Sequence, residues 1–174
     1  MESILEILKY VLPSLVVMAT SWILIHYYHK SFTRDQNREL LLQDRRKTLP
    51  LRLQAYERMT LFLERITADS LVVREQENDL TSREFHQRLL IIVRAEYEHN
   101  LAQQIYLSAE AWSLIRGAME ATLNLVHSAI QQVDPDGPAL ELSKKILELQ
   151  SEQEHSAPQV ALQYLKTEVL TKVL

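Results

Sequence analysis

The longest apolar stretch of the chain runs from Tyr10 to His29, twenty residues without a formal charge between Lys9 and Lys30. A helix of this length, at about 1.5 Å of rise per residue, spans roughly 30 Å, the thickness of the hydrocarbon core of a bilayer. No site with small residues of the kind that signal peptidases cleave interrupts its carboxyl end, so removal as a signal peptide is not expected. The pattern predicts a retained transmembrane anchor over residues 1–30.

Aromatic and basic residues at the carboxyl end of this stretch fit a membrane interface. Trp22, Tyr27 and Tyr28 carry amphipathic rings suited to the headgroup region, and Lys30 follows them. One basic residue precedes the stretch, whereas six lie in residues 30–47. Because basic residues are retained on the cytoplasmic side, we expect a single-pass protein of the inner membrane. Its N-terminus would lie outside and its C-terminal domain in the cytoplasm.

The segment after the anchor, residues 31–47, is polar and predicts a basic juxtamembrane helical stalk. Leu42, Leu49, Tyr56 and Leu63 recur at intervals of seven, but without a second apolar position per heptad they are weak support for a coiled coil. The basic residues here either attract anionic headgroups or serve only as the topology signal.

Charge is distributed unevenly along the chain. Residues 30–47 carry six basic and three acidic side chains, whereas residues 48–174 carry twelve basic and eighteen acidic ones. An acidic body disfavours nucleic acid as a partner, because phosphate contacts require a concentrated basic face. A lipid bilayer and a protein partner or second copy of the chain are the expected partners.

Apolar residues recur at intervals of three and four through most of residues 48–174, which predicts a domain of about five helices. Pro50 suits the first position of a helix, and residues 81–84, TSRE, form a capping box. The segment DPDGP at 134–138 is the clearest break. The expected helices cover residues 50–66, 81–106, 108–133, 139–154 and 158–174, with residues 71–73 as a short apolar plug. Short connections predict antiparallel neighbours.

Glycine and cysteine are scarce, and this limits the possible chemistry. The chain has two glycines and no cysteine. Neither a Walker-type phosphate loop nor a dinucleotide-binding glycine motif can be formed, and thiolate catalysis and thiolate metal sites are excluded. We therefore expect an all-α protein, and predict no catalytic residue, cofactor or metal.

Two segments carry a resemblance to known sequences, LPLRLQAYERMTLFLERI at Leu49 to Ile66 and YEHNLAQQIYLS at Tyr97 to Ser108. They resemble a family of uncharacterised, single-pass, helical membrane proteins from Bacteroidota. The resemblance implies an envelope-associated bacterial protein and no known activity. It transfers no functional residue to this chain.

One polar group could carry chemistry. Glu96, His99, Asn100 and Gln103 lie on or beside the apolar stripe of the helix expected over residues 81–106. Three interpretations stay open at this stage. The residues are expected to form a buried hydrogen-bond network, a solvated end of the bundle, or a pocket in which glutamate and histidine exchange protons.

The motif E-x-x-H, which supplies ligands in di-iron bundles, occurs at Glu96–His99 and again at Glu152–His155. The first motif is expected to face the core. The second falls on the solvated face of its helix, so a di-metal centre is not expected.

The sequence thus favours an interaction protein, such as a scaffold, assembly factor or regulatory subunit of a membrane-associated assembly. The alternative is an enzyme or ligand- or metal-binding bundle that uses the region of Glu96 and His99.

Overall fold

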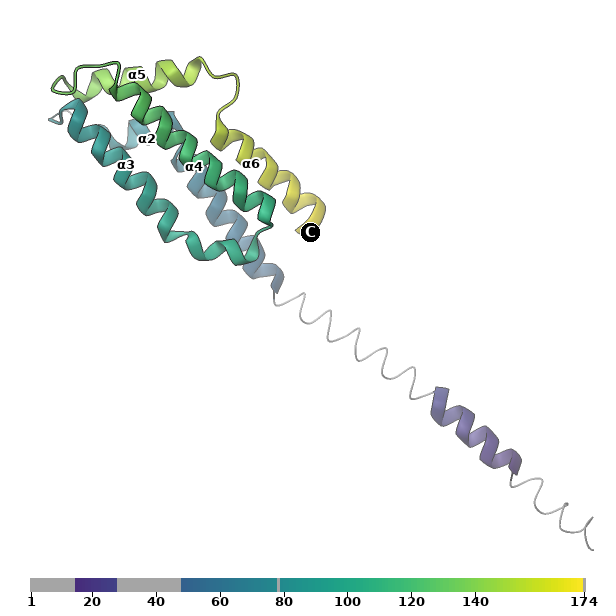
Figure 1. Ribbon diagram of the computed structural model, residues 1–174. Coiled ribbons are helices and arrows are strands. Elements are labelled where there is room, and N and C mark those ends of the chain that lie inside the picture. Colours follow the sequence, from purple (N-terminus) through teal and green to yellow (C-terminus); the bar gives the residue numbers. More distant parts are fainter. Residues whose placement is uncertain (1–14, 28–47, 78, 174) are drawn as a thin grey trace, which may run out of the picture. The chain divides into compact units, whose positions relative to one another are not determined.

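The computed structural model describes residues 15–27, 48–77 and 79–173, without the side chains of the last two of these residues (Figure 1). The chain divides into two compact units, Met1–Thr48 and Leu49–Leu174. The described residues form helices and connections, and among them the sole extended pairing is an isolated bridge between Thr81 and Pro138. The all-α character expected from the sequence is confirmed.

The expected transmembrane anchor is wrong for this structure. In the first unit the described helix covers residues 15–27, which corresponds to about 20 Å of rise. Among the described residues no helix is both long and apolar enough to cross a membrane. Trp22 and Tyr27, expected at an interface, are exposed. Tyr28, Lys30 and the stalk over residues 31–47 lie outside the described residues.

The second unit is built from four helical rods, two of which are broken. A helix over residues 48–65 is followed, after two residues, by α2 (Ala68–Glu75). The next two rods are α3 (Ser82–His99), extended by the 3₁₀ helix η1 (Leu101–Tyr106), and α4 (Ala109–Ile130).

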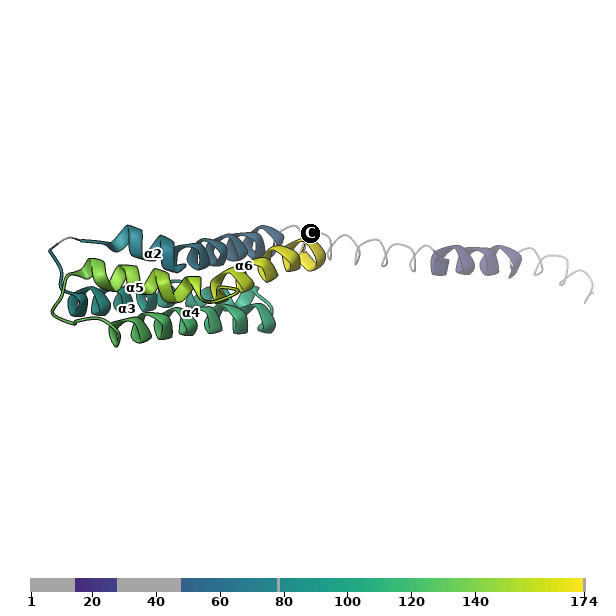
Figure 2. The ribbon, with the colours of Figure 1, turned by 90° about the horizontal axis from the view of Figure 1, so that it is seen from above.

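The fourth rod consists of α5 (Ala139–Ser151) and α6 (Ala157–Glu168), which ends in a π-helical turn, η2 (Val169–Val173). Both α5 and α6 pack on α4, one after the other along its length (Figure 2). The antiparallel arrangement expected for neighbours therefore does not hold for this pair.

Helix starts follow the sequence signals closely. The capping box is confirmed: the Thr81 hydroxyl accepts a hydrogen bond from the Glu84 amide, and the Glu84 carboxylate accepts one from the Thr81 amide. The break at residues 134–138 adds to this start, because the amides of Ser82 and Arg83 donate to carbonyls of that loop. Ser108 caps α4 through the amide of Ala111.

Two boundaries differ from the expectation. The segment expected as an apolar plug is part of α2, an eight-residue helix that buries Ala68, Leu71 and Val72. The helix expected to reach residue 106 ends at His99, and a 3₁₀ helix replaces its last turns. Asn100, at this boundary, has φ of −101° and ψ of 2°, outside α-helical geometry.

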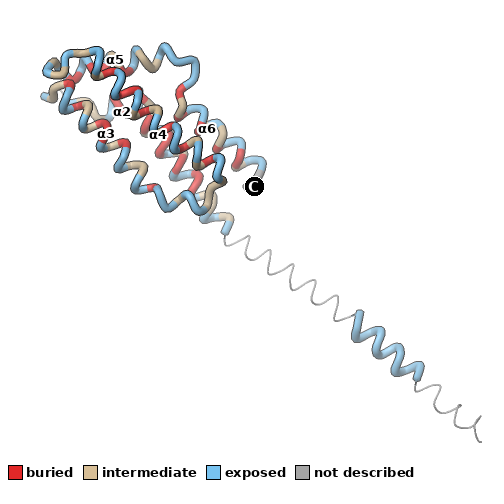
Figure 3. Tube along the Cα trace, viewed as in Figure 1, coloured by how far each residue is buried: buried red, intermediate tan, exposed pale blue. Residues whose placement is uncertain are grey.

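The core joins all four rods (Figure 3). Its largest fully buried side chains include Phe62, Phe85, Met59, Leu89, Ile115, Leu142 and Leu165.

An aromatic cluster lies at the edge of this core. Phe62 tilts against Tyr97 at a centroid distance of 6.0 Å, and Tyr97 stacks on Trp112 at 5.5 Å. Such pairs stabilise beyond the area they bury. The cluster thereby links the helix over residues 48–65 to α3 and α4.

The two glycines of the chain differ in the space around them. Gly117 is exposed on α4, and a Cβ at this position would meet no heavy atom within 4 Å. A Cβ at Gly137 would lie 3.2 Å from the Asp134 carbonyl oxygen and 3.1 Å from a carboxylate oxygen of Glu141. Space is therefore restricted at the loop glycine and not at the helical one.

Candidate functional site

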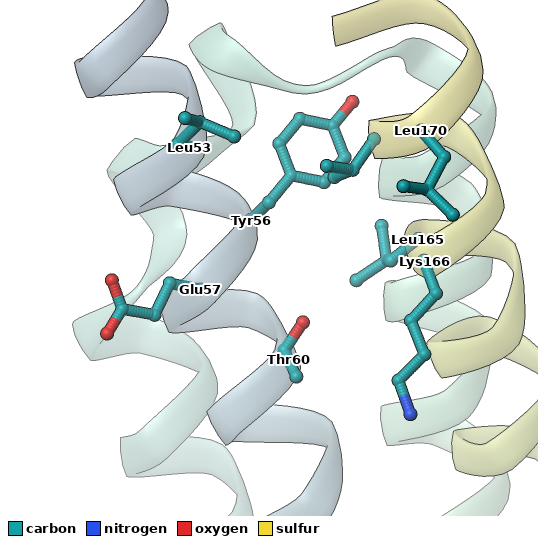
Figure 4. Close-up of a pocket in the computed structure, with 8 residues that line it drawn as sticks. Leu53, Tyr56, Glu57, Thr60, Leu165, Lys166 and Leu170 are labelled. Atoms are coloured by element: carbon teal, nitrogen blue, oxygen red, sulfur yellow. The ribbon is translucent and has the colours of Figure 1, made fainter. Parts of the chain in front are cut away.

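An open groove of about 450 Å³ lies between the helix over residues 48–65 and the end of the last rod (Figure 4). Its apolar lining comes from Leu53 on one wall and from Leu165, Val169 and Leu170 on the other. Leu170, in the π-helical turn, is 72% exposed. An exposed leucine beside this apolar lining makes the groove a candidate binding site.

The polar residues of the groove occupy defined places. Tyr56 and Thr60 line it from the helix over residues 48–65, as does Glu57, and Lys166 lines it from α6. Glu57 and Lys166 are both exposed, but the Glu57 carboxylate points away from α6 (Figure 4). The groove therefore combines an apolar floor with one basic edge, at Lys166.

A buried polar pair stands beside this groove. The Tyr56 hydroxyl donates a hydrogen bond of 2.9 Å to Oε2 of Glu168, and the two residues are only 3% and 4% exposed. Burial of an acidic side chain is costly unless it is hydrogen-bonded. The pair consequently fixes the end of α6 against the helix over residues 48–65.

The electrostatic setting of Tyr56 follows from this arrangement. Burial, the hydrogen bond to Glu168 and the negative charge of the Glu168 carboxylate raise the pKa of Tyr56 to about 12. Arg52 has the opposite effect and lowers this pKa. The phenol is therefore neutral at physiological pH and acts as a hydrogen-bond donor. It is not a proton-transfer group near neutrality.

The polar cluster expected from the sequence is only partly assembled. Asn100 is buried, and its side-chain amide donates to the Glu96 main-chain carbonyl at 2.8 Å. The Glu96 carboxylate forms a salt bridge of 3.0 Å with Arg65. Gln103 is partly buried and its main-chain amide donates to the Asn100 carbonyl, whereas His99 is exposed.

These contacts show that Glu96 and Asn100 have structural roles. Arg65 links the first rod to α3 through Glu96, and Asn100 closes the end of α3. The sequence missed Arg65, because this arginine is thirty-one positions away and shares no motif with Glu96. The arrangement brings Glu96 and Asn100 together and leaves His99 outside the contact.

The second E-x-x-H motif is not helical over its whole length. Because α5 ends at Ser151, Glu152 and His155 fall in the break before α6, and His155 is exposed. Carboxylate and imidazole share a helix face only where the helix continues. Within the described ranges no group of three or more His, Asp or Glu side chains is placed to hold a metal ion.

A contact between two histidines was not expected from the sequence. Nε2 of His86 on α3 lies 3.0 Å from Nδ1 of His127 on α4. The ring centroids are 4.9 Å apart and the ring planes are tilted by 60°. The partly buried position of His86, together with the charge of His127, lowers the pKa of His86.

By its fold and its groove the protein is an all-α bundle with an apolar surface groove. The chain belongs to a family of unknown function (DUF7935), whose model matches residues 2–172. This confirms the resemblance to an uncharacterised family, and the match carries no information on a source in Bacteroidota or on a membrane character. No curated protein and no solved structure matches the chain.

Proposed function

We propose that this protein is an interaction module whose groove binds an amphipathic helix of a protein partner. The observation that carries the proposal is the apolar groove between the helix over residues 48–65 and α6, with Leu170 exposed at its edge. Helix-in-groove recognition places the apolar face of one helix into such a channel, with anchors spaced by three and four residues.

Charge supports a helical partner of defined orientation. Lys166 lines the groove from α6 and is exposed. A helix lying in the groove is favoured when its acidic edge faces Lys166. Such a partner covers the exposed apolar surface and pairs the charge at the rim.

The test is copurification from source cells, compared between single variants of the full chain. Leu170→Lys places a charge in the groove and should remove a stoichiometric partner. Leu61→Lys is the matched control, because Leu61 is an exposed leucine on the helix over residues 48–65 that does not line the groove. Loss of the partner in both variants, or retention in both, would contradict the proposal.

A second copy of the chain is the other possible occupant. Sedimentation of the purified full chain distinguishes it. If the wild type and Leu61→Lys self-associate and Leu170→Lys does not, the occupant of the groove is a second copy of the chain and not a different protein.

The alternative of an enzyme or ligand-binding bundle gains no support at Glu96 and His99. Glu96 forms a salt bridge with Arg65, and His99 is exposed. Three predictions rest on the distribution of charge and stay predictions. They are contact with a lipid bilayer, a cytoplasmic domain and a location at the inner membrane. Exclusion of nucleic acid likewise stays a prediction, from the acidic balance of residues 48–174.

A further inference from the structure

We infer that His86 and His127 form a site for a divalent transition metal of the copper(II) type, independent of the groove. The two imidazoles come from different helices, α3 and α4, which pack side by side (Figure 1). Their nearest nitrogens, Nε2 of His86 and Nδ1 of His127, are 3.0 Å apart. Neutral imidazole nitrogens are the commonest protein ligands of such metals.

The spacing of the nitrogens selects the geometry. With metal–nitrogen distances of about 2.0–2.1 Å, two nitrogens 3.0 Å apart subtend an angle of about 95° at the metal. This value fits adjacent positions of a square-planar or tetragonal site, the arrangement that copper(II) and nickel(II) prefer. A tetrahedral zinc site requires a wider angle. Copper(II) is also the tightest-binding divalent ion of its series.

The surroundings permit access and tolerate the added charge. His127 is exposed and lies in the last turn of α4, where the helix dipole favours a cation. The two arginines next to His86 along α3 are already paired, Arg83 with Asp136 at 3.4 Å and Arg88 with Glu77 at 2.7 Å. A metal ion approaching the two nitrogens therefore meets solvent on one side.

The site supplies two protein ligands and leaves the others to water. No third His, Asp or Glu joins the pair in the portion of the chain described by the structure. Such a site is exchangeable, unlike a closed structural site with four protein ligands. The sequence predicted no metal because the two histidines are forty-one positions apart and belong to no ligand motif.

Titration of the full chain with copper(II) tests the inference. We expect His86→Ala and His127→Ala each to bind one ion fewer than the wild type. His99→Ala is the matched control, because His99 is an exposed histidine on the same helix as His86, and it should retain the full number. In the wild type, the copper(II) ion that the two variants fail to bind should give an electron paramagnetic resonance spectrum with coupling to two imidazole nitrogens.

Thermal melting gives a second readout, because an ion that bridges α3 and α4 binds only the folded chain and stabilises it. Copper(II) should raise the Tm of the wild type and of His99→Ala, and should leave both His86→Ala and His127→Ala unchanged. If the histidines form only a hydrogen bond, the two variants will bind as many ions as the wild type and show its shift in Tm. That result, or equal losses in His99→Ala, overturns the inference.

Discussion

Replacing Tyr56 by phenylalanine removes one hydroxyl from the buried pair and preserves the packing of the ring. The hydroxyl donates to Glu168 at 2.9 Å, and both residues are almost fully buried. Hydrogen bonds to charged groups contribute about 1.5–3 kcal/mol to stability. We therefore expect Tyr56→Phe to lower the free energy of unfolding by about 1.5–3 kcal/mol near pH 7.

The same substitution changes the dependence of stability on pH. In the folded state the pKa of Tyr56 is about 12, above its ordinary value of 10.0. The resulting stabilisation is fully present below pH 10 and is lost as the pH rises through 12. Two units of pKa correspond to about 2.7 kcal/mol. The advantage of the wild type over Tyr56→Phe should therefore shrink between pH 10 and pH 12.

Urea denaturation of both proteins, followed by circular dichroism at a series of pH values, measures this difference. Other groups that titrate in the range, including Tyr97, are common to the two proteins and cancel. Tyr164→Phe is the control, because its hydroxyl donates to Glu110 at 2.8 Å at an exposed site. It should cost less than about 1 kcal/mol. A difference between wild type and Tyr56→Phe that stays constant from pH 9 to pH 12 would refute the reasoning.

Three further substitutions test the fold by the same denaturation experiment. Phe62→Ala should cost about 3–5 kcal/mol, because Phe62 is 1% exposed and contacts Tyr97; a loss below 1 kcal/mol would show that the core is misassigned. Gly117→Ala should stabilise by about 0.5–1 kcal/mol, because its Cβ meets nothing, and a loss of stability would contradict the open surroundings. Thr81→Ala removes the cap of α3 and should cost about 0.5–2 kcal/mol; no change would mean that the loop at 134–138 is sufficient alone.

The sequence predicted well those features that depend on neighbouring residues. The capping box at Thr81 and the break at 134–138 each require only a few adjacent side chains, and both are present in the structure. The apolar periodicity likewise predicted a helix over residues 50–66, and Ala55, Met59 and Phe62 of the helix over residues 48–65 are buried.

The length of α3 was overestimated, because apolar periodicity alone does not fix where a helix ends. The periodic apolar positions continue past His99, yet the structure changes there to a 3₁₀ helix. Asn100 forms the end of α3 by donating to the carbonyl of Glu96. Asparagine competes for main-chain hydrogen bonds and so favours helix ends, which is a local signal against a continuous helix.

The groove and the histidine pair were not visible in the sequence for a different reason. Each depends on residues brought together from distant parts of the chain, such as Tyr56 with Glu168 and His86 with His127. From the sequence alone, a glutamate in a helix is expected to be exposed. Glu168 is buried because the first rod packs beside α6 and Tyr56 donates a hydrogen bond to its carboxylate. Pairs of this kind are determined by packing and not by local spacing.

The end of the last rod is the part of the bundle best suited to respond to a partner. Glu168, the last residue of α6, is held by Tyr56, whereas Leu170, two positions later, is largely exposed in the π-helical turn. Segments with few buried apolar contacts open at lower free energy than the core. A helix bound in the groove would bury Leu170 and add such contacts at this end. Protection from hydrogen exchange should therefore increase first in residues 169–173, and partner binding without this increase would place the interface elsewhere.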